Sequence, residues 1–408
     1  MPRLLLLLPA AGYANQDFIA AAARLNIEIV ACADYCHRLA PGWGLPPLMS
    51  VPFDQPGLAL PQVLAALSQP VDAVLAADDH GQALAAQLRE ALGLSGNPSE
   101  AVATLTDKLR FRHLQQAIGL PHPDFAEIKD GDINAAAALD FPLVVKARRL
   151  NASRGVIRAN DVDQLARALK QVQRIQARAQ RDAADLLVER FIPGVEVALD
   201  GVLSGGALRV LAVFDKPDPL DGPYFEETLF ITPSRLPNQT QRELADAVER
   251  ACVAAGVTEG VVHAEARINE AGVWLLEIAP RGIGGLCGRV FAATLGMDSA
   301  EIVLRHAVGL PLPLPAPAND SAAGVMMIPI PASGIFRGVD GLDAARAVPH
   351  ITGIEITAPP GHLVAPPPEG AGYLGFLFSR AATPQQAEAA LRAAHAALVV
   401  RIQSRVEP

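Results

Sequence analysis

The beginning of the chain alternates short apolar runs with segments of helical spacing. Apolar runs cover residues 4–8, 27–32 and 71–77, and residues 81–92 have apolar positions three and four apart. This alternation predicts parallel strands covered by helices, a small α/β domain over residues 1–95. The loop after the first run lacks the G-x-G-x-x-G fingerprint, so a dinucleotide site is not expected.

From residue 96 onward, strand-like runs outnumber helical ones. Helical spacing follows Thr106, whose hydroxyl can cap a helix, and recurs at residues 164–182 and 239–254. The strand-like runs cover residues 141–147, 185–191, 197–202, 208–215, 260–268 and 273–278. This pattern predicts an α+β domain. A Pro-rich stretch at 310–317 is typical of an extended linker, and short strands with a final helix from Thr383 follow it.

Composition and charge narrow the classes of function. The chain has 408 residues, of which 50% are hydrophobic and 19% charged, so it can bury a core and is not a disordered chain. The net charge of −9, without a basic run, argues against a nucleic-acid partner. Four cysteines (Cys32, Cys36, Cys252 and Cys287) show no ligand or disulfide pattern. The leucine run at 4–8 is too short for an export signal or a membrane span, so we expect a cytoplasmic protein.

Two glutamates are candidates for a metal site. Period-two alternation puts His263, Glu265 and Arg267 on one face of a strand. A three-residue loop at 270–272 would place Glu277 opposite Glu265, at about 5 Å. Facing carboxylates repel unless a cation lies between them, and their oxygens suit Mg²⁺. A solvated strand face, with one carboxylate paired to Arg267, explains this pair equally well when it is considered alone.

The residues after Glu277 favour the metal site. Strict alternation along this strand turns Leu275 to the same side as Glu277. The turn that follows, at 279–285, contains Arg281 among several glycines. Glycine allows close backbone approach, and arginine offers a planar fork for phosphate or carboxylate.

Further polar residues follow buried runs. Lys146 ends an apolar run, where a lysine is rarely left unpaired, and the small-residue loop at 151–156 could fold over phosphates. Lys108 lies on the first turn of the predicted helix. Another apolar strand carries Glu189 and ends in a turn before Glu196, which could offer backbone groups to adenine and a carboxylate to ribose. Each of these features alone is more typical of a surface residue or an ordinary strand end.

Taken together and in this order, the segments resemble the ATP-grasp superfamily of carboxylate–amine ligases. The matching segments are residues 96–98 with 107–108, 141–146, 153–156, 188–196, and 263–265 with 276–281. The resemblance implies an α/β and α+β multidomain fold. Its expected parts are a pre-ATP-grasp domain (1–95), an ATP-grasp domain (96–310) with a lid at about 112–190 and a catalytic part at about 191–310, and a small C-terminal α+β domain (318–408).

The resemblance also implies ATP and Mg²⁺, or Mn²⁺, as cofactors. The nucleotide is expected to contact Lys108, Lys146, Ser153, Glu189, the backbone of Arg190, Phe191 and Ile192, and Glu196. In this set the lysines would hold phosphates, Glu189 with the following backbone would read adenine, and Glu196 would hold the ribose. The metal ligands would be Glu265 and Glu277.

One departure suggests a branch of the superfamily. Many members have Asn two residues after the second metal carboxylate, and this chain has Ala279. The Glu-x-Ala-x-Arg pattern is similar to the L-amino-acid ligase, or dipeptide synthase, branch, in which the arginine faces the acyl phosphate. The resemblance therefore implies Arg281 and Lys146 as catalytic residues. The expected substrate residues are Glu227 (or Glu226), Arg281, Gly284 and Gly285.

These implications predict ATP-dependent amide formation between a carboxylate, expected to be an amino acid, and an amine, with release of ADP and phosphate. The partners would be ATP and small molecules, with a homodimer expected only from the family. The alternatives are a purine-biosynthetic ligase or biotin-dependent carboxylase, a regulatory nucleotide-binding protein without catalysis, and a two-lobed small-molecule binding protein.

Overall fold

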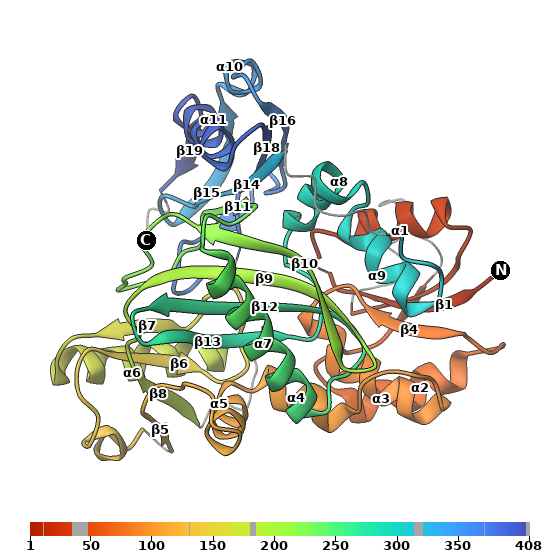
Figure 1. Ribbon diagram of the computed structural model, residues 1–408, viewed down its shortest axis with the longest axis horizontal. Coiled ribbons are helices and arrows are strands. Elements are labelled where there is room, and N and C mark those ends of the chain that lie inside the picture. The colour runs from red at the N-terminus through yellow and green to blue at the C-terminus, as the bar shows by residue number, and fades with distance from the viewer. Residues whose placement is uncertain are drawn as a thin grey trace.

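The computed structural model describes residues 1–10, 12–34, 48–129, 131–179, 185–313, 321–370 and 372–404. A large central sheet (green) continues into C-terminal strands (blue), and an N-terminal domain (red and orange) and a lid (yellow) lie beside it (Figure 1). The predicted mixed α/β and α+β architecture is confirmed. Within the described ranges, no helix combines the length and the apolar character needed to cross a bilayer.

The N-terminal sheet is parallel, as the alternating pattern predicts. Its strands lie in the order β3 (Leu48–Ser50), β2 (Glu28–Ala33), β1 (Arg3–Leu8) and β4 (Ala73–Ala76). One face of β1 packs on helices α1 (Asn15–Arg24) and α9 (Ser299–Ala307), and the other on α2 (Pro56–Ala66) and α3 (Gln82–Leu92). Because all five leucines of this strand are fully buried, the run at 4–8 is a core strand.

The residue that caps the helix of Lys108 lies one position after Thr106, the predicted cap. Thr106 is the last residue of α4 (Ser99–Thr106), and its hydroxyl donates to the carbonyl of Val102. Asp107 caps α5 (Lys108–Ala117) instead, because its carboxylate accepts from the backbone N–H groups of Leu109 and Arg110 at 3.0 and 3.3 Å. Lys108 is therefore the first helical residue.

The lid is a four-stranded antiparallel sheet in the order β5-β8-β6-β7. The strands are β5 (Phe125–Ile128), β6 (Leu143–Ala147), β7 (Val156–Ala159) and β8 (Leu186–Arg190), with a short helix, η3 (Ile133–Ala136), after β5. Helix α6 (Val162–Arg178) covers one face with its buried side. The predicted end of this helix, near residue 182, lies outside the described residues.

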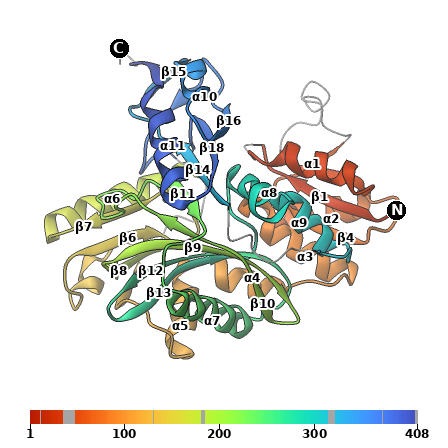
Figure 2. The same ribbon diagram turned by 45° about the horizontal axis from the view of Figure 1, so that its top comes forward.

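The central sheet has eight strands in the order β13-β12-β9-β10-β11-β14-β18-β16. They are β9 (Val195–Ser204), β10 (Ala207–Lys216), β11 (Leu229–Thr232), β12 (Gly260–Asn269), β13 (Gly272–Ala279), β14 (Ala322–Ile328), β16 (Ile351–Ile356) and β18 (Gly375–Ala381). Helices α4, α5 and α7 (Asn238–Ala255) lie on one side of it (Figure 2). The sheet thus continues from the ATP-grasp segment into the C-terminal segment without a break.

The remaining elements complete the C-terminal half. A three-stranded sheet contains β15 (Gly334–Asp340), β17 (Leu363–Val364) and β19 (Val399–Gln403), accompanied by α10 (Leu342–Arg346) and α11 (Pro384–Ala396). The glycine-rich turn leads into η4 (Cys287–Arg289) and α8 (Val290–Leu295). Part of the predicted linker at 310–317 lies outside the described residues, as does Cys36; Cys32, Cys252 and Cys287 are buried free thiols.

A bulge corrects the predicted faces of β13. The loop between β12 and β13 has two residues, because Asn269 pairs with Gly272, rather than the three predicted. An irregularity then lets Ala266 pair with Leu275 and Glu265 with Glu277, which leaves Leu276 as an extra residue. Leu275 consequently faces the core, contrary to strict alternation, while the predicted Glu265–Glu277 pairing is retained.

Candidate active site

A single cavity of about 1000 Å³ lies between the N-terminal sheet, the lid and the central sheet. Its walls include the predicted site residues except Glu226, the alternative to Glu227. These are Lys108, Lys146, Ser153, Glu189, Arg190, Phe191, Ile192, Glu196, Glu227, Glu265, Glu277, Arg281, Gly284 and Gly285. The cavity is large enough for a nucleotide together with small substrates, since single-ligand pockets occupy about 300–1000 Å³.

Lys108 joins three segments at one wall of the cavity. Its ammonium contacts the carboxylate of Glu277 at 3.0 Å and donates to the carbonyl of Leu150 at 2.8 Å. The preceding Asp107 binds Arg148 and Arg149, which fixes the start of the loop that contains Ser153. A buried cation is thereby placed between the second predicted metal carboxylate and the predicted phosphate loop.

The loop at 151–155 has an unusual backbone. Ala152 and Ser153 adopt positive φ angles of 51° and 54°, which is uncommon outside glycine. The loop is held from both sides, because Asn151 donates to Asp79 at 2.8 Å and the N–H of Gly155 donates to the carbonyl of Pro368 at 3.2 Å. Such backbone strain is typical of ligand-binding segments.

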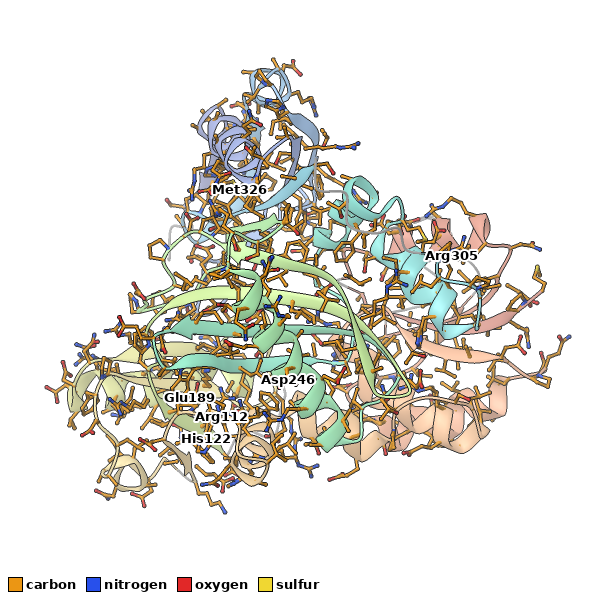
Figure 3. The ribbon with its side chains drawn as sticks, viewed as in Figure 1. Arg112, His122, Glu189, Asp246, Arg305 and Met326 are labelled. Carbon is orange, nitrogen blue, oxygen red and sulfur yellow. The ribbon has the colours of Figure 1, made fainter. Side chains whose placement is uncertain are left out.

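Glu189 belongs to a buried ion-pair network. Lys146 and Arg112 both contact its carboxylate, the latter at 2.8 Å, and Arg112 is fully buried between α5 and β8 (Figure 3). Burial alone would raise the pKa of Glu189, but the two cations outweigh it and lower the pKa to about 2. Sequence analysis missed Arg112, although its position four residues after Lys108 puts both on one helix face.

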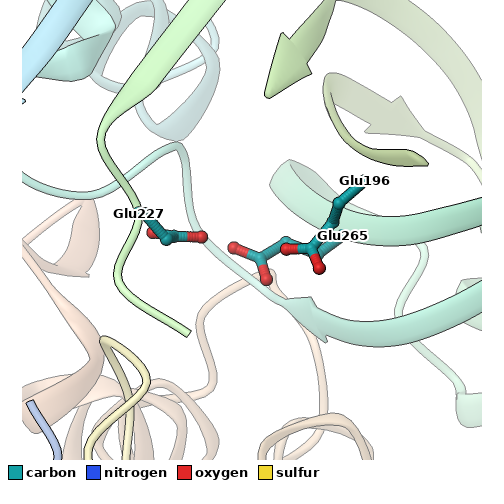
Figure 4. A group of neighbouring side chains, drawn as sticks. All are labelled: Glu196, Glu227 and Glu265. Atoms are coloured by element: carbon teal, nitrogen blue, oxygen red, sulfur yellow. The ribbon is translucent and has the colours of Figure 1, made fainter. Parts of the chain in front are cut away.

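Three carboxylates surround a third buried lysine. Lys216, the last residue of β10, contacts Glu196 at 2.9 Å, Glu265 at 3.2 Å and also Glu227. The three glutamates approach one another so that one oxygen from each lies within 4.8 Å of the others (Figure 4). Burial and the neighbouring Glu265 raise the pKa of Glu227 to about 8, whereas the carboxylates raise the pKa of Lys216 despite its burial. Sequence analysis missed Lys216, which ends a buried strand as Lys146 does.

The donor set fits Mg²⁺ but differs from the predicted pair. Glu265 and Glu277 are cross-strand partners, yet Glu277 binds Lys108 and Glu265 binds Lys216. Glu265 also belongs to the three-carboxylate group with Glu196 and Glu227. Carboxylate oxygens at this spacing are ligands that Mg²⁺ accepts, and Lys216 would compete with the ion for them.

Removal of Lys216 should therefore strengthen metal binding. We expect Lys216→Gln to bind Mg²⁺ or Mn²⁺ at least tenfold more tightly, because one positive charge leaves a group of three carboxylates. Calorimetric titration of the nucleotide-free protein measures this affinity. Lys129→Gln, which changes an exposed lysine paired with Glu127, is the control. Unchanged affinity in Lys216→Gln would place the metal elsewhere.

Arg281 is held by an aspartate of the N-terminal domain. Its guanidinium donates to both oxygens of Asp79, with Nε at 2.6 Å, and Asp79 also accepts from Asn151. Arg281 lowers the pKa of Asp79 against the effect of burial, so the pair is ionised. Asp79 follows β4, and nothing in its local sequence marks it, because its partners lie far along the chain.

A buried histidine supports the glycine-rich turn. Nδ1 of His263 lies 2.5 Å from Oδ1 of Asp200, and the other oxygen of Asp200 accepts from the N–H of Ile283 at 3.0 Å. Asp200 raises the pKa of His263 to about 9 although burial opposes this. The carboxylate thus ties the turn at 279–285 to the strand that carries Glu265.

Gly285 and Gly284 provide a matched test of this turn. Gly285 has a φ of 62°, and a Cβ there would lie 2.9 Å from the ring of Phe376, whereas a Cβ at Gly284 would lie no closer than 3.7 Å to Arg281. We expect Gly285→Ala to lower the free energy of unfolding by about 1–2 kcal/mol and Gly284→Ala to have a much smaller effect. Urea unfolding of both variants measures the difference; equal effects would contradict it.

Two segments of the chain match known family models. A family model described as the ATP-grasp domain matches residues 139–290, and one described as L-amino acid ligase C-terminal domain 2 matches residues 326–403. D-alanine–D-alanine ligase of Pseudomonas entomophila (strain L48) is 31% identical over 228 residues, which cover 53% of this chain and 69% of the relative. Carnosine synthase 1 of Gallus gallus is 32% identical over 275 residues, or 63% of this chain, but the match spans only 30% of that longer protein.

Solved structures share the whole fold. The L-amino acid ligase from Bacillus licheniformis superimposes with a TM-score of 0.81 at 24% identity, covering 99% of both chains. Carboxyaminoimidazole ribonucleotide synthase from Aspergillus clavatus, complexed with ATP, gives a TM-score of 0.75 at 18% identity and covers 97% of this chain and 98% of the other. These similarities extend from the N-terminal sheet to the C-terminal strands.

Proposed function

The chain belongs to the ATP-grasp superfamily of ATP-dependent carboxylate–amine ligases, and we propose that it joins the carboxylate of one amino acid to the amine of another. The products are a peptide bond, ADP and phosphate. The observation that carries the proposal is the set of charged groups that one cavity brings together. Buried lysines lie near the phosphate loop, three carboxylates surround Lys216, and Arg281 is linked to the loop through Asp79, which also accepts from Asn151.

The nucleotide lies at the lid end of the cavity in this proposal. Lys108 and Lys146 neutralise its phosphates, the loop at Ser153 covers them, and the backbone of residues 190–192 faces the adenine. Glu196 binds the ribose. The Glu189 carboxylate is held by Arg112 and Lys146, so it orients Lys146 as well as bordering the adenine site.

The chemistry proceeds in two steps. An oxygen of the substrate carboxylate attacks the γ-phosphorus of ATP, the bond to the β-phosphate oxygen breaks, and an acyl phosphate and ADP form. The amine of the second amino acid then attacks the acyl carbon, phosphate leaves, and the amine loses a proton. Bound Mg²⁺, held by Glu265 with Glu277 or with the neighbouring glutamates, supplies positive charge for the phosphates. Arg281 stabilises the charge that develops on the acyl oxygen and the phosphate.

Glu227 supports the choice of amino acids as substrates. It lines the same cavity as Phe230 and Tyr373, and its carboxylate contacts Lys216. A carboxylate bordered by aromatic rings suits an ammonium group, which gains from charge pairing and from the ring faces. In this arrangement, Gly284 and Gly285 allow the substrate to approach the backbone of the turn.

The test is phosphate release from Mg·ATP, screened with pairs of the twenty amino acids. We expect release that requires two amino acids and disappears in Glu277→Ala, with the dipeptide identified by mass spectrometry. Release with one carboxylate alone would keep the acyl-phosphate step but indicate another amine. Release that depends on bicarbonate would indicate a carboxylase, and no release despite intact ATP binding would contradict the proposal.

A further inference from the structure

The cavity continues beyond the catalytic residues along β12. Val261, His263, Glu265 and Arg267 alternate along this strand, and all four line the cavity. At about 3.4 Å per residue, this face is about 20 Å long. The nucleotide end is at Arg267, which pairs with Glu196, so the cavity reaches well past Glu265 on the other side.

This far end, here named the rear chamber, is lined by Arg89, Ser95, Asn97, Val261 and Val303. Three contacts show that its walls are continuous. The side chain of Arg89 packs on Gly96, Asn97 binds the backbone of Glu259, and Val261 belongs to the apolar cluster on which Val303 packs. The chamber therefore lies between α3, the start of β12 and α9.

Arg89 is a partly buried cation with few partners. Its Nη1 donates to the carbonyl of Val74 at 3.0 Å, while its Nε is buried without a hydrogen-bond partner. Burial lowers the pKa of Arg89. In the described part of the chain, no carboxylate lies within ion-pair distance of Arg89, in contrast to Arg112 and Arg281. A desolvated cation of this kind gains strongly from an anionic partner.

The rest of the chamber is mostly apolar or already hydrogen-bonded. The Asn97 amide is already hydrogen-bonded, because its oxygen accepts from the N–H groups of Thr258 and Glu259 and its nitrogen donates to the carbonyl of Glu259. Val261 and Val303 supply apolar walls. Gly96 has a φ of 148°, and a Cβ there would lie 2.6 Å from Arg89, so the backbone holds the arginine tightly in place. Glu259 and His306 also line the cavity here, but they contact each other at 3.5 Å, and Glu259 accepts from the N–H of Gly205 at 2.8 Å. Among the described residues of the chamber, Arg89 is left as the cation without a carboxylate partner, which suits a ligand with one negative charge and an apolar body.

We propose that the rear chamber binds a small carboxylic acid with an apolar body, whose carboxylate pairs with Arg89. Two kinds of molecule fit this description, here named the two sources of the carboxylate. The first is an amine substrate with a carboxylate at its far end, and the second is a separate acid that does not react. Only the first source rests on the proposed function. Val261 lies four residues, or about 14 Å, from Glu265. An α-amino acid is too short for that span, so an amine substrate that reaches Arg89 is a peptide or another extended amine.

The binding test uses calorimetry to measure the affinities of N-acetyl-L-leucine and N-acetyl-L-leucinamide for the protein without ATP. Their blocked amines prevent peptide formation. We expect the acid to bind wild-type protein at least tenfold more tightly than the amide, and Arg89→Gln to remove this preference. Arg110→Gln, which changes an exposed arginine paired with Glu100, should keep it. Equal affinities in wild type, or a preference that persists in Arg89→Gln, would overturn the proposal.

A second variant covers the case in which Arg89→Gln fails to fold. Val303→Phe narrows the chamber from α9 without removing a charge, and it should weaken binding of N-acetyl-L-leucine at least tenfold. Unchanged binding in that variant would also overturn the proposal.

Turnover then separates the two sources. A KM at least tenfold lower for glycyl-leucine than for glycyl-leucinamide, each used as the amine substrate, indicates the first source. If N-acetyl-L-leucine changes the rate at which amino acids are joined but is not itself consumed, the second source is indicated. Equal KM values together with an unaffected rate would overturn both. If only the proposed function fails, phosphate release is absent while N-acetyl-L-leucine still binds.

Discussion

Arg112→Met is expected to lower the free energy of unfolding by about 3–5 kcal/mol. The guanidinium is fully buried, pairs with Glu189 at 2.8 Å and donates to the carbonyl of Leu276 at 2.9 Å. Removing Arg112 leaves the buried Glu189 carboxylate with Lys146 as its remaining cation, and a buried charge that has lost part of its compensation costs far more than the pair itself contributes. Urea unfolding at neutral pH measures the loss, if the dependence of the unfolding free energy on urea concentration is held at the same slope for both proteins.

The matched control is Arg110→Met on the same helix. Arg110 pairs with the exposed Glu100, and exposed pairs contribute only about 0–1 kcal/mol. If both variants lose the same stability, the change is in helix propensity and not in the buried pair.

Acid unfolding provides a second readout of the Arg112–Glu189 pair. Because the pKa of Glu189 is lowered to about 2, its contribution is complete above the unfolded pKa of about 4.3 and is lost as pH falls toward 2. Arg112→Met should reduce that loss.

The residues of the site that sequence analysis identified all belong to recognisable local patterns. Lys146 ends a buried run, Glu265 and Glu277 alternate with apolar residues, and Arg281 follows among glycines. The prediction that Glu265 faces Glu277 is confirmed, although the predicted loop length and the predicted strict alternation along β13 are both wrong. The loop is one residue shorter than predicted, and the bulge at Leu276 adds that residue back.

The residues that sequence analysis missed depend on distant parts of the chain. Asp79 meets Arg281 across 202 positions, and Arg112 meets Glu189 across 77. No local period encodes such contacts, since each forms only when segments far apart in the sequence pack together. Lys216 is different, because a lysine that ends a buried strand is visible in the sequence, and the reasoning applied to Lys146 applies to it as well.

Domain organisation was predictable only in part. Alternating strands and helices identify the N-terminal parallel sheet, and the apolar runs identify most of the later strands, whereas the lid follows only from the resemblance to the superfamily. The sequence does not reveal that β14, β18 and β16 extend the central sheet, because pairing of β11 with β14 joins segments separated by about ninety residues and a Pro-rich stretch. A linker composition indicates chain stiffness and carries no information on strand pairing.

Arg281→Lys is expected to lower kcat by about 10²–10³-fold while leaving ATP affinity within about threefold. Lysine keeps the positive charge but lacks the planar fork that Arg281 uses toward Asp79 and, in the proposed mechanism, toward the acyl phosphate. Losing one preoriented donor at a developing oxyanion has effects of this size. Steady-state phosphate release with the identified amino acids gives kcat, and titration with a nucleotide analogue gives the affinity.

Arg305→Lys is the control for this change, because Arg305 is paired with Glu301 on α9 and should tolerate lysine. Asp79→Asn separates positioning from direct contact. It keeps the shape of the partner but removes the charge that holds Arg281, so we expect a smaller loss of kcat than in Arg281→Lys. Equal kcat values in wild type and Arg281→Lys would show that Arg281 only links the N-terminal domain to the glycine-rich turn. A loss of ATP affinity that matches the loss of kcat would instead place its guanidinium on the nucleotide.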